Sequence, residues 1–185
     1  MGALKFRVLL DTEQSTEIFR DIVINENDSF ESFYHAIIAS FRFQGDQMAS
    51  FYMSNDDWDK GHEISLMDMN YGDEALDQKA SVMSSAILSD FIELSDQKVI
   101  LVYDFIRMWI FLIELIERIP ETIESPQTTL AIGMAPPEDS RMVNLEEDDD
   151  DLFGEEDFDD LDDDQDDDFE DGLDEEDYQN FDQEY

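Results

Sequence analysis

Residues 98–115 read Lys98-Val-Ile-Leu-Val-Tyr-Asp-Phe-Ile-Arg-Met-Trp-Ile-Phe-Leu-Ile-Glu-Leu115, within the one long apolar stretch of this 185-residue chain. The charged residues Asp104, Arg107 and Glu114 interrupt it, and each would cost about 2.5–3.5 kcal/mol at the centre of a membrane-spanning helix. The β-branched and aromatic residues on both sides of Asp104 disfavour one long helix. The stretch therefore predicts a buried β-hairpin with strands at 98–103 and 108–115, central in a sheet and covered on both faces.

A helix pattern precedes this stretch. The apolar residues recur at i, i+3, i+4, i+7, i+8 and i+11, and they are Phe30, Phe33, Tyr34, Ile37, Ile38 and Phe41. This spacing places them on one stripe of a helix over about residues 29–42. Asp28 and Glu31 have capping-box spacing, and Gly45 is the expected stop.

Alternating or β-branched runs predict further strands around the helix, at residues 4–10, 19–24, 49–53 and 62–66. The first two form a hairpin, residues 68–80 form a loop, and residues 84–91 form a short helix. From Ser125 onward, Pro126, Gly133, Pro136 and Pro137 are expected to end regular structure. The prediction is an α+β domain, a mixed or antiparallel sheet of about five strands packed by one main helix.

The C-terminal segment has a different composition. Residues 145–185 hold 25 Asp and Glu among 41 residues and no Lys or Arg. A segment of this charge cannot bury enough apolar surface to offset the entropy of ordering. We predict a folded domain at residues 1–140 and a disordered acidic tail at residues 141–185.

The net charge and the absence of Cys limit the possible functions. A formal charge of −41 repels phosphate backbones and anionic lipids, so neither direct nucleic-acid binding nor membrane docking is expected. Without Cys there is no disulfide, thiolate metal site or Cys nucleophile. The N-terminal residues contain no apolar signal core, and the expected location is cytoplasmic.

Several segments, taken in order, resemble the plasmid pRiA4b ORF-3-like family. They are Phe19-Arg-Asp-Ile22, residues 33–38 with Phe41, Tyr103-Asp-Phe105 with Trp109, and Pro136-Pro-Glu-Asp139. The sequence departs from the family at several positions. Ile106-Arg107 stands where the family has a Gly-Asp pair, and Ala135 stands where it has Cys. The family also has His residues near the positions of Gln47 and Phe111. The resemblance spans about residues 4–140. It implies an α+β domain with no well-established activity, in a family associated with insertion elements.

Candidate sites within residues 1–140 have simpler interpretations. His35 and His62 lack partners at ligand spacing, so each is interpreted as a satisfied or solvated histidine. Asp104 could be a functional carboxylate, but Asp is also common in turns, and turn chemistry is favoured. Trp58 and Trp109 are interpreted as packing residues. The acidic loop at 55–61 lacks the Glu of a calcium-binding loop and is interpreted as an ordinary polar loop. No catalytic residue, cofactor or metal is predicted.

The tail contains aromatic residues that a purely solubilising segment would not need. The candidates for contact with a basic partner protein are Phe153, Phe158, Phe169 and Phe181. The leading hypothesis is a non-enzymatic interaction protein whose tail binds basic partners or mimics nucleic-acid charge. One alternative is that the tail only keeps the protein solvated. The others are that the protein is a mobile-element accessory protein that regulates a recombinase, or an enzyme using scattered carboxylates such as Asp104. The sequence does not indicate an oligomeric state.

Overall fold

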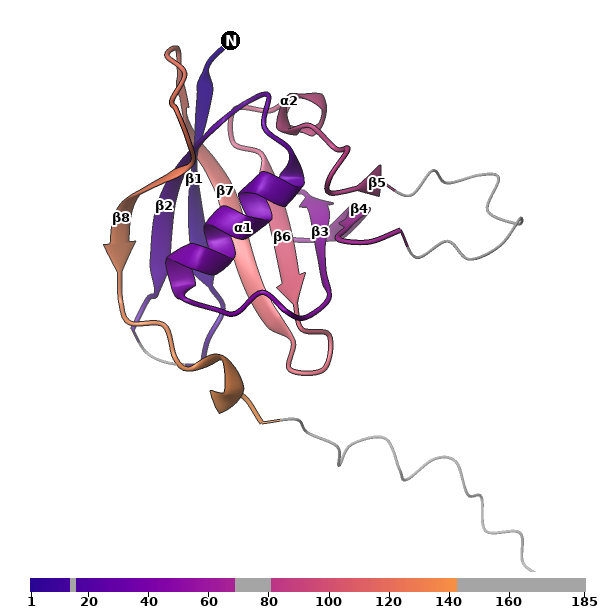
Figure 1. Ribbon diagram of the computed structural model, residues 1–185, viewed down its shortest axis with the longest axis vertical. Helices are drawn as coiled ribbons and strands as arrows, with labels where there is room; N and C mark the ends of the chain where they lie inside the picture. The colour runs from indigo at the N-terminus through magenta and orange to yellow at the C-terminus, as the bar shows by residue number, and fades with distance from the viewer. Residues whose placement is uncertain (14–15, 69–80, 143–185) are drawn as a thin grey trace, which may run out of the picture. The chain divides into compact units, whose positions relative to one another are not determined.

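An eight-stranded sheet organises the residues described in the computed structural model, which are 1–13, 16–68 and 81–142 (Figure 1). The strands are β1 Ala3–Leu10, β2 Phe19–Asn25, β3 Ala49–Ser54, β4 Lys60–Ser65, β5 Ser81–Val82, β6 Lys98–Tyr103, β7 Trp109–Ile119 and β8 Gln127–Ile132. Their order across the sheet is β5-β4-β3-β6-β7-β1-β2-β8, and β4 and β5 form a parallel pair. The other neighbours are antiparallel. This mixed sheet with one main helix confirms the α+β class.

Helix α1, Phe30–Phe41, covers one face of the sheet (Figure 1). All six residues of its predicted apolar stripe are buried, with at most 4% of their surface exposed. The Phe33 ring lies 4.7 Å from the Phe6 ring and 5.8 Å from the Phe51 ring, measured between centroids. The stripe is therefore part of the core, as its spacing predicted, and the structure adds that it packs against strands β1 and β3.

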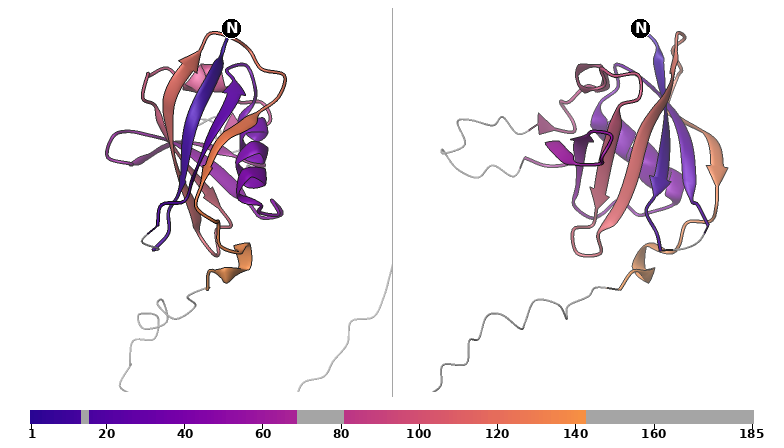
Figure 2. Two further views of the ribbon diagram at one scale, coloured as in Figure 1. Left: turned by 90° about the vertical axis from the view of Figure 1, so that its left-hand side faces the viewer. Right: turned by 180° about the vertical axis from the view of Figure 1, so that it is seen from behind.

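The predicted central hairpin is confirmed. Strands β6 and β7 pair from Lys98 opposite Glu114 to Tyr103 opposite Trp109. Residues 99–103 of β6 are buried on both faces, but β7 alternates between buried and half-buried positions over residues 109–115 and is exposed at residues 116–118. The expectation that both strands are covered on both faces is therefore wrong for β7. Its second face lies on the side of the sheet away from α1 (Figure 2, right).

The ends of α1 differ from the predicted caps. Ser29 is the N-cap, because its backbone is extended and its Oγ accepts a hydrogen bond of 3.2 Å from the Ser32 amide. The predicted box of Asp28 and Glu31 is therefore off by one residue. The helix ends at Arg42, which adopts the left-handed conformation with φ 62°. Gly45, with φ 75°, forms a later bend and not the stop.

Strand β8 corrects the expectation that regular structure ends at Ser125. Pro126 and Gly133 do not end it; they border a six-residue strand that pairs with β2. All six residues are exposed, so the strand has no buried face to produce an apolar alternation in the sequence. A 3-10 helix, η1 Glu138–Ser140, follows.

Two smaller expectations are met in part. The predicted helix at 84–91 is shorter and is confined to α2, Leu88–Phe91. The predicted loop at 68–80 and the predicted tail fall almost wholly outside the described residues. Among the helices that the structure describes, none is long and apolar enough to cross a membrane.

Candidate functional site

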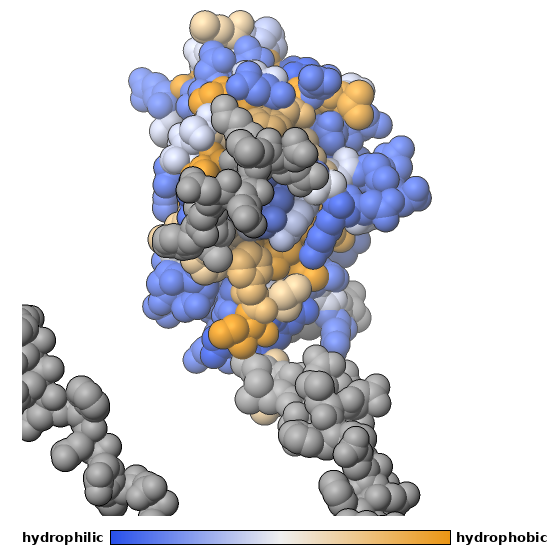
Figure 3. All heavy atoms as spheres, turned by 90° about the vertical axis from the view of Figure 1, so that its right-hand side faces the viewer, coloured by the Kyte–Doolittle hydropathy of each residue, from blue (hydrophilic) through white to orange (hydrophobic). Residues whose placement is uncertain are grey.

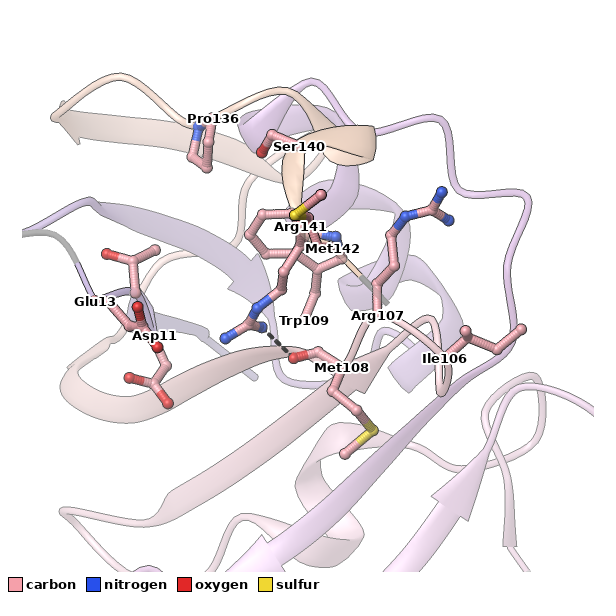
Figure 4. Close-up of a pocket in the computed structure, with 11 residues that line it drawn as sticks. Asp11, Glu13, Ile106, Arg107, Met108, Trp109, Pro136, Ser140, Arg141 and Met142 are labelled. Atoms are coloured by element: carbon pink, nitrogen blue, oxygen red, sulfur yellow. Dashed lines mark hydrogen bonds between the residues drawn. The ribbon is translucent and has the colours of Figure 1, made fainter. Parts of the chain in front are cut away.

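A pocket of about 690 Å³ lies beside the turn between β6 and β7 (Figure 4). Three segments far apart in the sequence line it: the residues that follow β1, the turn itself, and the C-terminal end of the described chain. The lining residues are Asp11, Thr12, Glu13, Ile106, Arg107, Met108, Trp109, Pro136, Ser140, Arg141 and Met142. Their order in the sequence would not reveal that they meet.

The turn on one side of this pocket is built around Asp104, which has φ 57° and is only 2% exposed. Its Oδ1 accepts hydrogen bonds from the amides of Ile106 and Arg107, at 3.0 and 3.1 Å. Its Oδ2 accepts a hydrogen bond of 3.2 Å from the Arg107 guanidinium. The interpretation of Asp104 as a turn residue is therefore confirmed, and its carboxylate is fully engaged within the turn.

Trp109 and Arg141 form the centre of the pocket (Figure 4). The Trp109 ring is buried, and its Nε1 donates a hydrogen bond of 3.1 Å to the Glu138 carbonyl oxygen. The Arg141 guanidinium lies 5.1 Å from the centre of that ring and donates to the Met108 carbonyl oxygen. Trp109 therefore holds the C-terminal end of the domain against the hairpin, a packing role as predicted.

Behind Trp109, the side chains of Tyr103 and Glu138 join the sheet to the residues after α1. The Tyr103 hydroxyl donates to Glu138 Oε1 at 2.6 Å and accepts a hydrogen bond of 3.0 Å from the Gly45 amide. Glu138 Oε2 accepts a 2.6 Å hydrogen bond from the Gln44 amide. Burial and the bond to Glu138 raise the pKa of Tyr103 above its ordinary value. The carboxylate of the Pro136-Pro-Glu-Asp139 segment thus has a structural role.

Tyr34 adds a buried hydroxyl to this region. The residue is fully buried, and its hydroxyl has no hydrogen-bond partner among the described residues. Burial, followed by the nearby carboxylates of Glu138 and Asp46, raises the pKa of Tyr34 to about 12. The Tyr34 hydroxyl is therefore neutral at physiological pH, and it supplies no charge for catalysis or binding.

The segments that resemble the family meet around this pocket or serve the core. Arg20 is buried at 6% exposure, and its guanidinium donates to four backbone carbonyl oxygens, those of Phe19, Ser40, Ile132 and Gly133. Gln47 donates a hydrogen bond to Asp46 at the surface, and the Phe111 ring packs 5.0 Å from the Phe41 ring in the core. The sequence did not show that Arg20 ties β2 to the end of β8, because that contact spans 112 residues.

The pocket presents both signs of charge. Asp11 and Glu13 lie on one side and Arg107 on the other, with Arg141 between them (Figure 4). Ser140 and Thr12 are the hydroxyl side chains in the lining, and neither histidine contributes to it. Among the described residues, no group of three or more His, Asp or Glu is placed to hold a metal ion. The lining therefore combines acidic, basic, hydroxyl and apolar side chains.

The other sequence candidates are dispersed. His35 is exposed on α1, and His62 pairs with the Ser81 hydroxyl at 2.8 Å while stacking on Phe91. The loop at 55–59 is held by Asn55, whose side-chain oxygen accepts hydrogen bonds from the amides of Asp57 and Asp59. Trp58 packs under Lys98, 5.5 Å from its ammonium group. Phe153, Phe158, Phe169 and Phe181 lie outside the described residues.

The basic side chains of the described domain are largely engaged within it. Four pair with carboxylates, namely Lys5 with Glu117, Arg7 with Asp21, Lys98 with Asp56 and Arg107 with Asp104. Arg20, Arg118 and Arg141 donate to backbone carbonyl oxygens, and Lys60 lies over the Tyr52 ring. Because the chain has 51 Asp and Glu against 10 Lys and Arg, most carboxylates have no basic side chain to pair with.

Comparison with known proteins gives a family and a fold. A family model described as plasmid pRiA4b ORF-3-like protein matches residues 2–184. A crystal structure of a protein of unknown function, MM3350 from Methanosarcina mazei Go1, is similar with a TM-score of 0.62 and 24% identity. The match covers 76% of this chain and 75% of that chain, and at this identity it shows the fold alone. No curated protein matches the chain.

Proposed function

Because the chain belongs to the plasmid pRiA4b ORF-3-like family, whose name states no activity, we propose a function from the charge of the chain itself. The protein is a non-enzymatic interaction protein, and its acidic tail binds basic protein partners in the manner of a nucleic-acid mimic. The observation that carries this proposal is the run of 25 acids among residues 145–185 with no base. Such a run attracts cationic surfaces and repels phosphate.

The arrangement of the domain supports this proposal. Its conspicuous polar residues, Arg20, Asp104 and Glu138, are engaged in holding the fold. Its basic side chains are mostly paired or bonded to the backbone, as described above, so they offer little positive surface to an anionic partner. Charge complementarity therefore favours partners rich in Lys and Arg.

The test compares three full-length proteins as bait: the native chain, a variant with the acids of residues 145–185 changed to Asn and Gln, and a variant with Phe153, Phe158, Phe169 and Phe181 changed to Ser. The partner captured by the native chain is purified, and its affinity is measured as salt rises. We expect neutralisation to abolish binding, and salt near 0.5 M to weaken it strongly because the Debye length falls to a few Å. Loss of affinity in the Ser variant would add the aromatic side chains to the interface, while pure electrostatics predicts no change.

Retention of the partner by the neutralised variant would refute the role of the tail. A chain ending before Val143 distinguishes the enzyme hypothesis from the interaction hypothesis. An enzymatic activity of the domain would survive that deletion, whereas capture of the partner by the tail would not. Capture of a recombinase by the native chain would favour the second candidate, an accessory protein of a mobile element, which rests on family membership.

A further inference from the structure

Strand β8 forms an outer edge of the sheet. It is last in the strand order, and within the described part of the chain it pairs along one side only, with β2 (Figure 2, left). All six residues, Gln127–Ile132, are exposed. The Ile132 carbonyl oxygen accepts a hydrogen bond from Arg20, but the amides and carbonyls of residues 127–131 that point away from β2 face no other strand among the described residues.

The composition of this edge is unusual for so acidic a protein. Gln127-Thr-Thr-Leu-Ala-Ile132 has no charged residue and no Pro, although the chain contains 51 Asp and Glu. Edge strands are usually protected from pairing by charges, Pro or bulges. On β8 the register shift between Leu130 and Thr128 is such a bulge, where the Thr129 hydroxyl donates to the Asp21 carbonyl oxygen, and it disfavours pairing at that point. Beyond it, Leu130–Ile132 continue in regular register with β2 and carry neither charge nor Pro, so this part of the edge lacks the usual protection.

The side chains on β8 also favour an added strand. Ala131 lies opposite Arg20, whose guanidinium lies over the Phe41 ring of α1, so Leu130 and Ile132 point to the opposite, helix-free face. They are 40% and 41% exposed. Ile132 lies at one end of a row of residues that are paired in register from strand to strand across the sheet. From β2 to β3 the other members of this row are Phe19, Leu9, Leu112, Ile100 and Tyr52.

Acidic residues lie in the segments that border both ends of the strand. Glu17 is exposed and its backbone carbonyl oxygen closely approaches Gly133, which follows β8. Glu121 and Glu124 are exposed in the segment that leads into β8. An occupant with basic residues at its ends and neutral, β-prone residues in its centre would match this distribution.

From these observations we propose that β8 is the site at which an extended, basic-flanked segment of a partner protein adds a ninth strand to the sheet. Main-chain hydrogen bonds supply the affinity, and alternate apolar side chains of the segment pack beside Leu130 and Ile132. A second copy of this chain is a weaker fit, because each copy carries a net charge of −41. The inference rests on the proposed function only in taking the partner to be basic.

The probe is a synthetic peptide of alternating Thr and Val with a pair of Lys at each end, added to the full-length protein. Its control has Pro in place of every second Thr, which keeps the charge but prevents strand pairing. We expect the first peptide to slow amide exchange within residues 127–131 by about tenfold at ten times its Kd, and the Pro peptide to have no such effect. Equal effects of both peptides on β8, or protection confined to residues 145–185, would overturn the proposal.

A matched pair of variants tests the side chains. Changing Leu130 and Ile132 together to Thr should weaken the binding measured at β8 by about tenfold, since Thr keeps strand propensity but removes apolar area. Leu94→Thr, at a residue 61% exposed outside β8, should leave that binding unchanged. Equal affinities for all three proteins would count against the packing of the segment on this edge.

Two further outcomes separate this inference from the proposed function. Protection at residues 127–131 without any effect on residues 145–185 supports the edge and counts against the tail. If the chain alone sediments as a dimer whose β8 amides are already protected, a second copy fills the edge and the partner-segment proposal fails.

Discussion

The Tyr103 hydroxyl donates a 2.6 Å hydrogen bond to Glu138, and this bond ties the end of a central strand to a segment that follows the last strand of the sheet. Tyr103 is fully buried, and Glu138 and Gly45 are half-buried, so loss of the Tyr103 hydroxyl would leave Glu138 Oε1 and the Gly45 amide without this partner in a partly shielded region. The same hydroxyl accepts a hydrogen bond from the Gly45 amide, and this bond connects the residues after α1 to Tyr103.

Replacing Tyr103 by Phe should therefore lower the free energy of unfolding by about 1–3 kcal/mol, because Glu138 Oε1 and the Gly45 amide lose the Tyr103 hydroxyl, while Glu138 Oε2 keeps the Gln44 amide. Chemical denaturation measures the change. The matched control is Tyr52→Phe, which removes a 3.1 Å bond to Glu63 at the surface and should change stability by less than about 0.5 kcal/mol. Equal effects of the two substitutions would show that the Tyr103 contact contributes nothing beyond an exposed bond.

Alkaline pH should destabilise the protein through Tyr34. Its folded-state pKa of about 12 lies above the ordinary value of 10.0, so the unfolded chain releases the proton first as pH rises. Stability is fully present below pH 10 and declines between about pH 10 and 12, by about 2–3 kcal/mol in total. Denaturation curves across this range should fall less steeply for Tyr34→Phe than for the native chain. Identical pH slopes would contradict the raised pKa.

At neutral pH the same Tyr34→Phe substitution should be nearly neutral, or stabilising by up to about 1 kcal/mol. It removes a buried hydroxyl that has no partner among the described residues, while the ring that packs in the core remains. A loss of more than about 1 kcal/mol in a denaturation experiment would indicate that the hydroxyl is hydrogen-bonded in solution.

The stripe on α1 should dominate the stability of the domain. Phe33→Ala should destabilise by about 3–5 kcal/mol, because the fully buried ring packs against both Phe6 and Phe51. His35→Ala, on the exposed side of the same helix, should change stability by less than about 0.5 kcal/mol. A Phe33→Ala effect as small as that of the control would mean that the stripe faces water.

Asp104 should tolerate Asn far better than Ala. Asn can adopt the left-handed conformation at φ 57°, and its side-chain oxygen can still accept hydrogen bonds from the amides of Ile106 and Arg107. Ala loses these bonds and leaves Arg107 without its carboxylate, at a cost of about 2–3 kcal/mol once the partial exposure of Arg107 is taken into account. Thermal unfolding of both variants measures this. An Asn variant as unstable as the Ala variant would assign the whole effect to the lost charge.

The sequence predicted the elements that have a buried face. Strand β1 and helix α1 follow from apolar periodicity, the β6–β7 hairpin follows from β-branched and aromatic residues on both sides of Asp104, and the role of Asp104 follows from turn preference. Strand β8 could not be predicted in this way, because none of its residues is buried and its pairing with β2 spans more than 100 residues. Periodicity carries no information on such long-range backbone pairing.

The pocket was missed for a related reason. Its lining comes from the residues after β1, the β6–β7 turn and the C-terminal end of the domain, and only the folded sheet brings these together. The turn also places Phe105, Ile106 and Met108 at the surface, where they are 43%, 69% and 39% exposed. Figure 3 shows apolar surface at the end of the sheet where this turn lies. The sequence prediction placed Phe105 and Ile106 in the turn and Met108 at the start of a strand, but apolar residue type alone does not show that these side chains are exposed.

Strand β8 also has a consequence for the order in which the protein is made. Five consecutive residues of β2, 20–24, are buried, yet β2 acquires its outer neighbour only after synthesis has passed Ile132. For the seconds in which the ribosome adds the intervening residues, the nascent sheet presents an apolar, unpaired edge of the kind that aggregates. A chain that stops before Gln127 keeps that edge permanently, so its solubility should depend on chaperones to a degree that the complete domain does not require.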